Sequence, residues 1–359
     1  MHDVIVIGMG AMGSATAFHL AKRGAKVLGL EQFDIPHSRG SSHGHSRMIR
    51  QAYFEHPDYV PLLKRAYELW FDLERESGQK LFHVTGGVYV GKLDGSLVAG
   101  SRKAAELHGL PHEMLTREQL QARFPQIIVP DDHVALVEPA AGLLIPERVV
   151  ASHARLALEH GGELHAHEPV TSWTADGAGV RVTTTKGTYK AKHLVIAAGT
   201  WASRLVRDLG VTIRPTRQVL GWVWPKKPEL FALGKLPVWA IQNDDGSEHY
   251  GFPMMPEAPG FKLAHHFPGD NTDPDRNEWA AKPEDEATFR PFLKRHFPDA
   301  DGPLLGIRIC MYENSPDSHF IIDRHPVTPN VTVACGFSGH GFKFSSVVGE
   351  VLADLATSG

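Results

Sequence analysis

The chain has 359 residues, of which 42% are hydrophobic and 22% charged, and its formal net charge is −4 at pH 7. This length and composition predict a globular protein of two domains with a large apolar core. The small net charge gives no reason to expect a nucleic acid or an anionic membrane as a partner. Two cysteines do not make a disulfide framework. We find no apolar run near the roughly 18 residues that cross a bilayer, and no signal or lipidation sequence, so we expect a cytoplasmic protein.

The beginning of the chain predicts a β-α-β unit. Residues 3–7 form an apolar run that ends at a glycine, which is typical of a buried parallel strand. Residues 11–23 place apolar side chains near helical spacing, Gly24 would end that helix, and residues 26–31 return as a second strand. Two parallel strands joined by a helix are the usual start of a nucleotide-binding domain.

The turn between the first strand and the helix has the sequence G-x-G-x-x-G. Its first glycine permits a tight turn, its second lets a pyrophosphate approach the backbone, and its third allows close packing of helix on strand. Glu31 closes the second strand, where a carboxylate would bind a ribose 2′-hydroxyl and disfavour the 2′-phosphate of NADP. These residues predict a nucleotide cofactor but leave NAD and FAD as alternatives. The expected contacts are Gly8, Gly10, Ala11, Met12, Gly13 and Glu31.

The rest of the chain contains segments that predict helices and strands like those of the first unit, and one long region with a different pattern. Helices are expected over residues 59–76, 97–108, 149–159 and 344–356, and strands over 170–174, 180–184, 188–191, 194–198 and 331–335. Between about residues 215 and 303 the aromatic and proline content rises and the apolar pattern alternates, as in an antiparallel sheet.

We therefore predict an α/β protein with two domains. A Rossmann-type nucleotide-binding domain would be discontinuous, formed by residues 1–80, 140–214 and 304–359. A second α+β domain for the substrate, built on a mixed or antiparallel sheet, would be formed by residues 81–139 and 215–303.

Three long motifs, in the same order along the chain, resemble those of one family. Residues 36–50 resemble its flavin loop, Cys310-Met311-Tyr312 followed by residues 317–323 resembles its covalent-flavin segment, and residues 336–343 resemble its C-terminal active-site turn. The similarity runs from Asp3 to about Leu355. The chain thus resembles the monomeric sarcosine oxidase family, which includes N-methyl-tryptophan oxidase and the peroxisomal sarcosine/pipecolate oxidases.

The resemblance implies FAD as the cofactor, joined by a thioether from Cys310 to the 8α-methyl carbon of the flavin. Cys335 has no such counterpart, and we expect it to be a small core residue. Val170, Gly199 and Trp201 are also expected at the cofactor, the last two in a second strand–glycine turn. The remaining implied cofactor contacts are Ser41, Ser42, His43, Ser46, Arg47, Met311, Gly339, His340, Gly341, Phe342 and Lys343.

Four basic residues receive roles from the resemblance. Arg50 and Lys343 would hold the carboxylate of the substrate, a task suited to two fixed cations. Arg47 would lie against the flavin ring and favour its reduced, anionic form. Lys262 would activate O2, because a buried cation stabilises developing superoxide, and burial is expected to lower its pKa.

Three further side chains are expected around the substrate. By the same resemblance, Tyr250 and His266 would contact the amine and the substrate, and Tyr312 would line the pocket. The spacing leaves His265 and His266 as alternatives. We prefer His266, because on a strand it would share one face with Lys262.

The implied reaction is the oxidation of an N-methyl or cyclic secondary amino acid by a monomeric enzyme. Sarcosine, O2 and water would give glycine, formaldehyde and H2O2. L-Pipecolate and N-methyl-L-tryptophan remain alternative substrates. An amine dehydrogenase with another electron acceptor and a flavin-binding protein without turnover remain alternative functions. No metal site is expected, because histidine pairs such as His43 and His45 lack a third convergent ligand.

Overall fold

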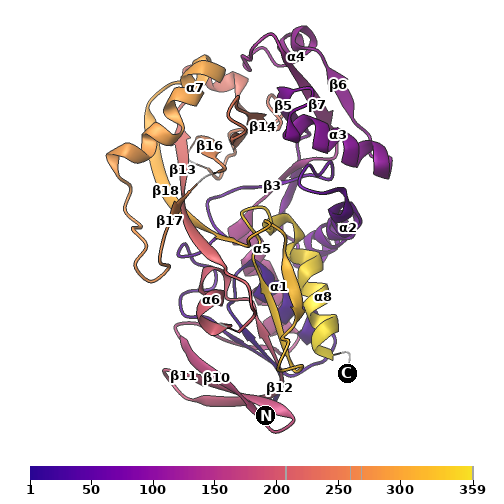
Figure 1. The fold of residues 1–359 in the computed structure, drawn as a ribbon, viewed down its shortest axis with the longest axis vertical. Coiled ribbons are helices and arrows are strands. Elements are labelled where there is room, and N and C mark those ends of the chain that lie inside the picture. Colours follow the sequence, from indigo (N-terminus) through magenta and orange to yellow (C-terminus); the bar gives the residue numbers. More distant parts are fainter. Residues whose placement is uncertain (207, 259, 268, 358–359) are drawn as a thin grey trace.

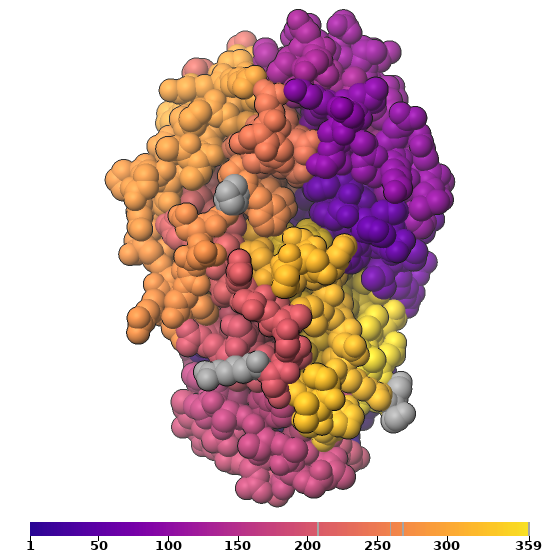
Figure 2. Space-filling view, viewed as in Figure 1, coloured from indigo at the N-terminus to yellow at the C-terminus, as the bar shows by residue number. Residues whose placement is uncertain are grey.

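The computed structural model describes residues 1–206, 208–258, 260–267 and 269–357. The molecule is elongated, with one sheet and its helices in the lower half of Figure 1 and a second, larger sheet across the upper half. The two halves form one continuous body in the space-filling view (Figure 2). Among the described residues, no helix combines the length and the apolar character that crossing a membrane requires.

The lower sheet has a parallel centre in the order β20-β12-β1-β2-β9. These strands are β1 (His2–Ile7), β2 (Val27–Leu30), β9 (Glu163–His165), β12 (Thr188–Ile196) and β20 (Val331–Cys335). Antiparallel strands extend it, namely β10 (Val170–Asp176), β11 (Gly179–Thr184) and β19 (Ile321–Arg324). The predicted β-α-β unit is present as β1, α1 (Ala11–Lys22) and β2.

One expectation for this sheet was wrong. Residues 188–191 and 194–196, expected in two separate strands, belong to the single strand β12, which ends two residues before the expected end at 198. Its first part pairs with β11 and its second part with β1, so hydrogen bonding continues through the polar residues between them. Those residues are accommodated individually: His193 bonds Thr332 Oγ1 at 2.8 Å, and Lys192 pairs with Asp3 at 2.7 Å.

Helices cover the lower sheet and carry its core. Helix α1 packs against α5 (Pro146–Glu159) and α8 (Ser345–Thr357), and α2 (Val60–Ser77) packs against α8. Helix α5 begins three residues earlier than predicted, because Pro146 is tolerated in a first helical turn. Short helical segments complete the set: η1 (Pro57–Tyr59), η2 (Gly199–Trp201), η3 (Pro228–Leu230), η4 (Pro283–Thr288), η5 (Pro298–Ala300), η6 (Phe342–Phe344) and α6 (Ala202–Leu205).

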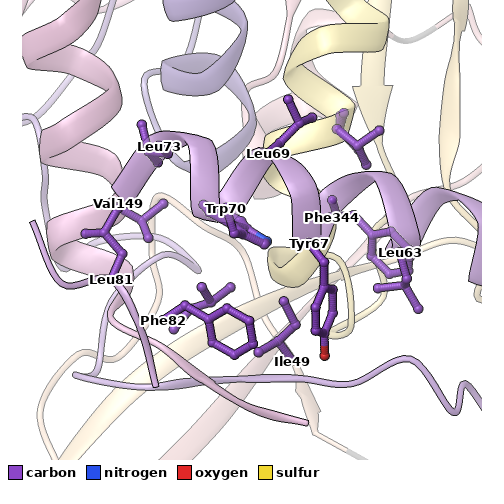
Figure 3. Close-up of a cluster of buried hydrophobic side chains, with 14 of the residues drawn as sticks. Ile49, Leu63, Tyr67, Leu69, Trp70, Leu73, Leu81, Phe82, Val149 and Phe344 are labelled. Carbon is purple, nitrogen blue, oxygen red and sulfur yellow. The ribbon is translucent and has the colours of Figure 1, made fainter. Parts of the chain in front are cut away.

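The apolar face of α2 forms a cluster that also fixes the turn η6 (Figure 3). Trp70 is fully buried, and its Nε1 donates to the carbonyl oxygen of Lys343 at 2.9 Å. Burying a large apolar side chain contributes about 1.5–3 kcal/mol. The core therefore holds the backbone of Lys343 in place.

The upper sheet follows the order β17-β13-β16-β15-β14-β5-β7-β6, with β18 also on β13. The strands are β5 (Gly87–Lys92), β6 (Glu113–Leu115), β7 (His133–Glu138), β13 (Arg214–Val223), β14 (Val238–Gln242), β15 (Glu248–Phe252), β16 (Phe261–His265), β17 (Asp270–Asn271) and β18 (Leu304–Asn314). All pairs are antiparallel except β5 with β14, so the sheet is mixed. Helices α3 (Ser96–His108), α4 (Arg117–Arg123) and α7 (Arg290–His296) accompany it.

The predicted boundary between residues 303 and 304 does not coincide with a change of sheet. Strand β18 pairs with β13 from Arg214↔Asn314 to Val223↔Leu304. The chain returns to the lower sheet only at β19. Cys310 and Tyr312 thus lie on a strand of the upper sheet.

A small third sheet lies between these two. It contains β3 (Arg47–Ile49), β4 (Phe82–Val84) and β8 (Gly142–Leu144) in the order β3-β8-β4. This pairing fixes the segment from Gly44 to Ala52, which carries Arg47 and Arg50, between the upper and lower halves.

The G-x-G-x-x-G turn leaves no room for a side chain at its first and third glycines. Gly8 has φ +88°, a conformation that L residues rarely adopt, and a Cβ on Gly13 would lie 1.7 Å from the carbonyl oxygen of Gly8. A Cβ on Gly10 would meet Ser42 Oγ at 3.5 Å, an ordinary contact. Gly13 is therefore required for packing, whereas Gly10 is not.

Gly13→Ala is expected to destabilise the protein by at least about 3 kcal/mol, because the clash is with backbone and exceeds the gain in helix propensity. Thermal unfolding and soluble yield would measure this loss. Gly10→Ala should leave the melting temperature of the cofactor-free chain nearly unchanged. Gly187→Ala is the control, since no atom lies within 4 Å of that Cβ position. Equal stability of the Gly13→Ala and Gly10→Ala proteins would contradict this account.

Candidate functional site

A cavity of about 400 Å³ lies at the carboxyl ends of the parallel strands. Ile7, Leu30 and Ala334 contribute to its wall from the ends of β1, β2 and β20, which is where open α/β sheets bind their ligands. Most of the predicted cofactor contacts line it: Gly8, Gly10, Ala11, Met12, Glu31, Ser41, Ser42, Arg47, Val170, Gly199, Trp201, Gly339, Gly341 and Phe342. Tyr312, predicted at the substrate, lines it as well. One cavity therefore extends from the glycine turn to β18.

The glycine-turn end suits a dinucleotide. Gly10 caps α1 without a side-chain hydrogen bond, and Ala11 N at the start of the helix donates to Ser42 Oγ at 3.2 Å. The positive end of the helix faces the cavity. The carboxylate of Glu31 is buried and accepts hydrogen bonds from Met9 N at 2.8 Å and Phe33 N at 3.1 Å. This geometry fits a diphosphate at the helix terminus and a ribose beside Glu31.

Other predicted cofactor residues lie behind the cavity wall. Gly13 serves the helix packing described above. Ser41, which does line the cavity, donates from its Oγ to the carbonyl oxygen of Met311 at 2.6 Å, which ties the flavin loop to β18. His43 is buried, and neither ring nitrogen has a hydrogen-bond partner among the described residues. Burial and the charge of Arg47 lower the pKa of His43 to about 3, so the ring is neutral.

Lys262 is 1% exposed and projects from β16 into a cage of oxygen atoms. Its Nζ donates to Gly44 O at 2.7 Å, to Ser46 O at 2.8 Å and to Ser46 Oγ at 3.1 Å. It also lies 4.7 Å from the ring centre of Phe252. Burial and the charge of Arg47 hold the pKa of Lys262 well below its ordinary value. The amino group of Lys262 is thus held in a fixed position by three oxygen acceptors.

Arg47 and Cys310 are in contact. One guanidinium nitrogen of Arg47, Nη2, donates to Ser41 O at 2.6 Å and lies 3.6 Å from Cys310 Sγ. Its Nη1 donates to Ser46 O at 2.9 Å. The structure therefore brings together a positive charge, a buried thiol and the flavin loop. The second cysteine differs: Cys335 is part of the core of the lower sheet, and burial and the charge of Glu313 raise its pKa.

Arg50 and Lys343 lie around one buried tyrosine. The guanidinium carbon of Arg50 is 4.5 Å from the ring centre of Tyr53, and Lys343 Nζ is 5.1 Å from the same point. Lys343 Nζ donates to the carbonyl oxygen of His340 at 2.8 Å. Arg50 already has a carboxylate partner, because its Nη2 donates to both oxygens of Glu55 at 2.7 and 2.8 Å.

The charges of this group are unbalanced. Burial alone would raise the pKa of Glu55, but Arg50, His340 and Lys343 lower it to about 2. Burial and the neighbouring charge of Arg50 lower the pKa of Lys343 to about 7. Two buried cations thus share one carboxylate, and a second carboxylate would stabilise the charge on Lys343.

Tyr250, Tyr312 and His266 form a neutral polar group. The two hydroxyls are 3.5 Å apart, and His266 Nδ1 is 3.1 Å from the hydroxyl of Tyr312. Burial lowers the pKa of His266 to about 3. Strand β16 ends at His265, so His266 follows the strand and is not part of it. The ring of His265 packs against His249 instead, with centroids 4.6 Å apart.

Three carboxylates that bind the segment with Arg47 and Arg50 were not predicted from the sequence. Glu55 pairs with Arg50, Glu138 accepts from Gln51 N at 2.7 Å and Ala52 N at 3.2 Å, and Glu147 accepts from Gly44 N at 2.7 Å. Glu138 is the last residue of β7, Glu147 lies in the first turn of α5, and both bind backbone groups about 90 to 100 residues away. No periodicity or motif marks such contacts. The described residues contain no group of three or more His, Cys, Asp or Glu side chains that could hold a metal ion.

Comparisons with known proteins agree with this geometry. The family model of FAD dependent oxidoreductases matches residues 3–355. The monomeric sarcosine oxidase of Streptomyces avermitilis is 47% identical over 100% of this chain and 94% of its own length. That of Bacillus sp. strain NS-129 is 42% identical, covering 99% and 93%. The N-methyl-L-tryptophan oxidase of Salmonella heidelberg is 36% identical, covering 99% and 94%.

Among solved structures, the chain is similar to NikD, described as an unusual amino acid oxidase essential for nikkomycin biosynthesis. The TM-score is 0.88 at 26% identity, covering 99% of this chain and 94% of NikD. The expected α/β fold with a second mixed sheet is confirmed. The chain belongs to the FAD-dependent oxidoreductase family and, within it, to the group of monomeric sarcosine oxidases and N-methyl-L-tryptophan oxidases.

Proposed function

We propose that this FAD-dependent oxidoreductase is a monomeric, cytoplasmic sarcosine oxidase, which converts sarcosine, O2 and water to glycine, formaldehyde and H2O2. The observation that carries the proposal is the pair of buried cations, Arg50 and Lys343, around Tyr53, with the carboxylate of Glu55 bonded to Arg50. The monomeric sarcosine oxidases at 47% and 42% identity support the small substrate over N-methyl-L-tryptophan, whose oxidase is 36% identical. N-Methyl-L-tryptophan and L-pipecolate are the second candidates.

The residues present fit FAD. The N-terminus of α1 and the glycine turn would hold its diphosphate, Glu31 its ribose, and Arg47 would lie near the flavin ring. When bound, FAD accepts two electrons and a hydrogen from the carbon next to the substrate nitrogen and passes the electrons to O2. We further propose that Cys310 carries the flavin through a thioether, because Arg47 places a positive charge 3.6 Å from its sulfur.

The substrate would be oriented from both ends. Arg50 and Lys343 would bind the carboxylate, with Arg50 turning part of its hydrogen bonding from Glu55 to the substrate. His266, neutral because its pKa is about 3, adds no positive charge next to the amine. A neutral wall favours the uncharged amine, whose lone pair is needed before a hydrogen can leave the adjacent carbon. Fixing both ends supplies the orientation that the reaction needs.

Lys262 supports an oxidase over a dehydrogenase. Its ammonium group is held by three oxygen acceptors in a site that excludes water. A fixed, desolvated cation stabilises the negative charge that develops on O2. We therefore propose O2 as the electron acceptor.

A substrate panel tests the proposal directly. Sarcosine, L-pipecolate, L-proline and N-methyl-L-tryptophan would be compared with a peroxide assay in air and by bleaching of the flavin bands without O2. We expect the highest kcat/KM for sarcosine, with one H2O2 released per turnover. Bleaching without peroxide would indicate a dehydrogenase, and no bleaching with any of these amines would indicate a protein without turnover.

Acid precipitation tests the covalent link. We expect a yellow pellet from the wild type and a colourless pellet with a yellow supernatant from Cys310→Ala. Cys335→Ala is the matched control, because that thiol lies in the core and should not affect attachment. A colourless wild-type pellet would rule out the thioether.

The pH dependence of carboxylate binding tests Lys343. Propionate, which has no amine, would be titrated against the visible spectrum of the flavin between pH 5.5 and 8.5. The protonated lysine is the form that binds a carboxylate, so affinity should be highest below pH 7 and should weaken as the pH rises through about 7.

Lys343→Met should remove the fall in propionate affinity near pH 7. It should also weaken binding at least about tenfold at low pH, since a charged hydrogen bond contributes about 1.5–3 kcal/mol. Lys294→Met, at an exposed position on α7, is the control. Glu248, whose pKa burial raises to about 8, would add a weaker step at higher pH that persists without Lys343. An unchanged step near pH 7 in Lys343→Met would contradict the assignment.

A further inference from the structure

A turn of the flavin loop separates Glu147 from Lys262. On one side of the turn, the carboxylate of Glu147 accepts hydrogen bonds from Gly44 N at 2.7 Å and His45 N at 3.1 Å. On the other side, the carbonyl oxygens of Gly44 and Ser46 accept from Lys262 Nζ at 2.7 and 2.8 Å. The amide groups of the turn thus face the carboxylate, and its carbonyl groups face the ammonium group.

The turn has a conformation that it would not adopt without support. Gly44 has φ +99° and His45 has φ +67°. A left-handed conformation costs a residue with a Cβ about 1–2 kcal/mol. Hydrogen bonds from two consecutive amides to one carboxylate offset this cost, because bonds to a charged acceptor are stronger than neutral ones. Glu147 lies in the first turn of α5, which fixes its position.

Glu147 also determines the charge balance around Lys262. The cations that act on Lys262 are Arg47 on β3 and Arg308 on β18, and the thiol of Cys310 and the ring of His43 lie in the same region. Glu147 is the carboxylate that opposes them. Burial would raise the pKa of Glu147, but the amides of His45 and Gly44 and the charge of Arg47 lower it, so the group stays ionised.

We propose that Glu147 is a positioning residue, which holds the Gly44–Ser46 turn in the form that binds Lys262 Nζ and balances the positive charge of Lys262 and Arg47. It touches neither the substrate nor O2 and acts only through the turn and through its charge. The inference rests on the proposed role of Lys262 in the reaction with O2.

Three substitutions separate the hydrogen bonds from the charge. Glu147→Gln keeps an oxygen acceptor for the two amides but removes the charge. Glu147→Asp keeps the charge on a shorter side chain, and Glu147→Ala removes both. Glu159→Gln, at the exposed end of the same helix, is the matched control.

The measurement is the protonation of Lys262 in the flavin-loaded protein. Lysines labelled with ¹³C at Cε would be titrated by NMR, and the signal absent from Lys262→Met identifies the residue. With Glu147→Gln we expect the titration midpoint of Lys262 to move to lower pH by about one pH unit, since an opposite charge nearby has at least this effect. Glu147→Asp and Glu159→Gln should stay close to the wild type, and Glu147→Ala should also lower the melting temperature.

The rate of flavin reoxidation by O2 would also be measured against pH in a stopped-flow instrument. Its pH dependence should shift in Glu147→Gln and stay close to that of the wild type in Glu147→Asp and Glu159→Gln. A Lys262 titration midpoint that is equal in the wild type and Glu147→Gln would overturn the proposal.

The hypothesis about Glu147 and the hypothesis about Lys262 would be contradicted by different results. Fast reoxidation in Lys262→Met would contradict the proposed role of Lys262, whereas the NMR titration would still decide whether Glu147 controls that lysine.

Discussion

The site depends on one constraint, the fixing of residues 44–52 between two sheets by two carboxylates, the buried Glu138 and the half-buried Glu147. Glu147 binds the amides at one end of this segment, and Glu138 binds those of Gln51 and Ala52 at the other. Strand β3 in the middle pairs with β8. A backbone amide left unpaired in this interior would cost about 1–3 kcal/mol, so each carboxylate strongly favours a single arrangement of the loop. Because the segment carries Arg47 and Arg50, the same contacts determine where two cations lie.

Burial of several cations in one region explains the electrostatics of the site. Arg47 lines the cavity, Arg50, Lys262 and Lys343 are buried, and burial lowers the pKa of both lysines. The structure tolerates this because each cation has fixed oxygen acceptors, such as the carboxylate of Glu55 for Arg50 and the turn carbonyls for Lys262. The excess positive charge is the property that favours anionic species, whether a substrate carboxylate or the charge that develops on O2.

Much of the fold and of the candidate site could be predicted from the sequence, partly from residue patterns and partly from resemblance to a family. The nucleotide turn was readable from periodicity and glycines, whereas Lys262, Cys310 and Lys343 were singled out only by resemblance of their motifs. Glu55, Glu138 and Glu147 could not be predicted, since a carboxylate that binds an amide or a guanidinium group elsewhere in the chain leaves no local pattern. The pairing of residues 304–314 with β13 could not be predicted for a similar reason, because the two segments are about 90 residues apart.

The sequence by itself determined the family and the nucleotide-binding unit. All the groups of that unit lie within the first 31 residues, and a strand, a tight turn and a helix place them by local geometry alone. Only the tertiary structure decided which carboxylate binds which cation or amide, which of two adjacent histidines contacts Tyr312, and how burial shifts each pKa. These properties depend on distances between segments far apart in the chain and on exclusion of water, and neither exists until the two sheets have packed together.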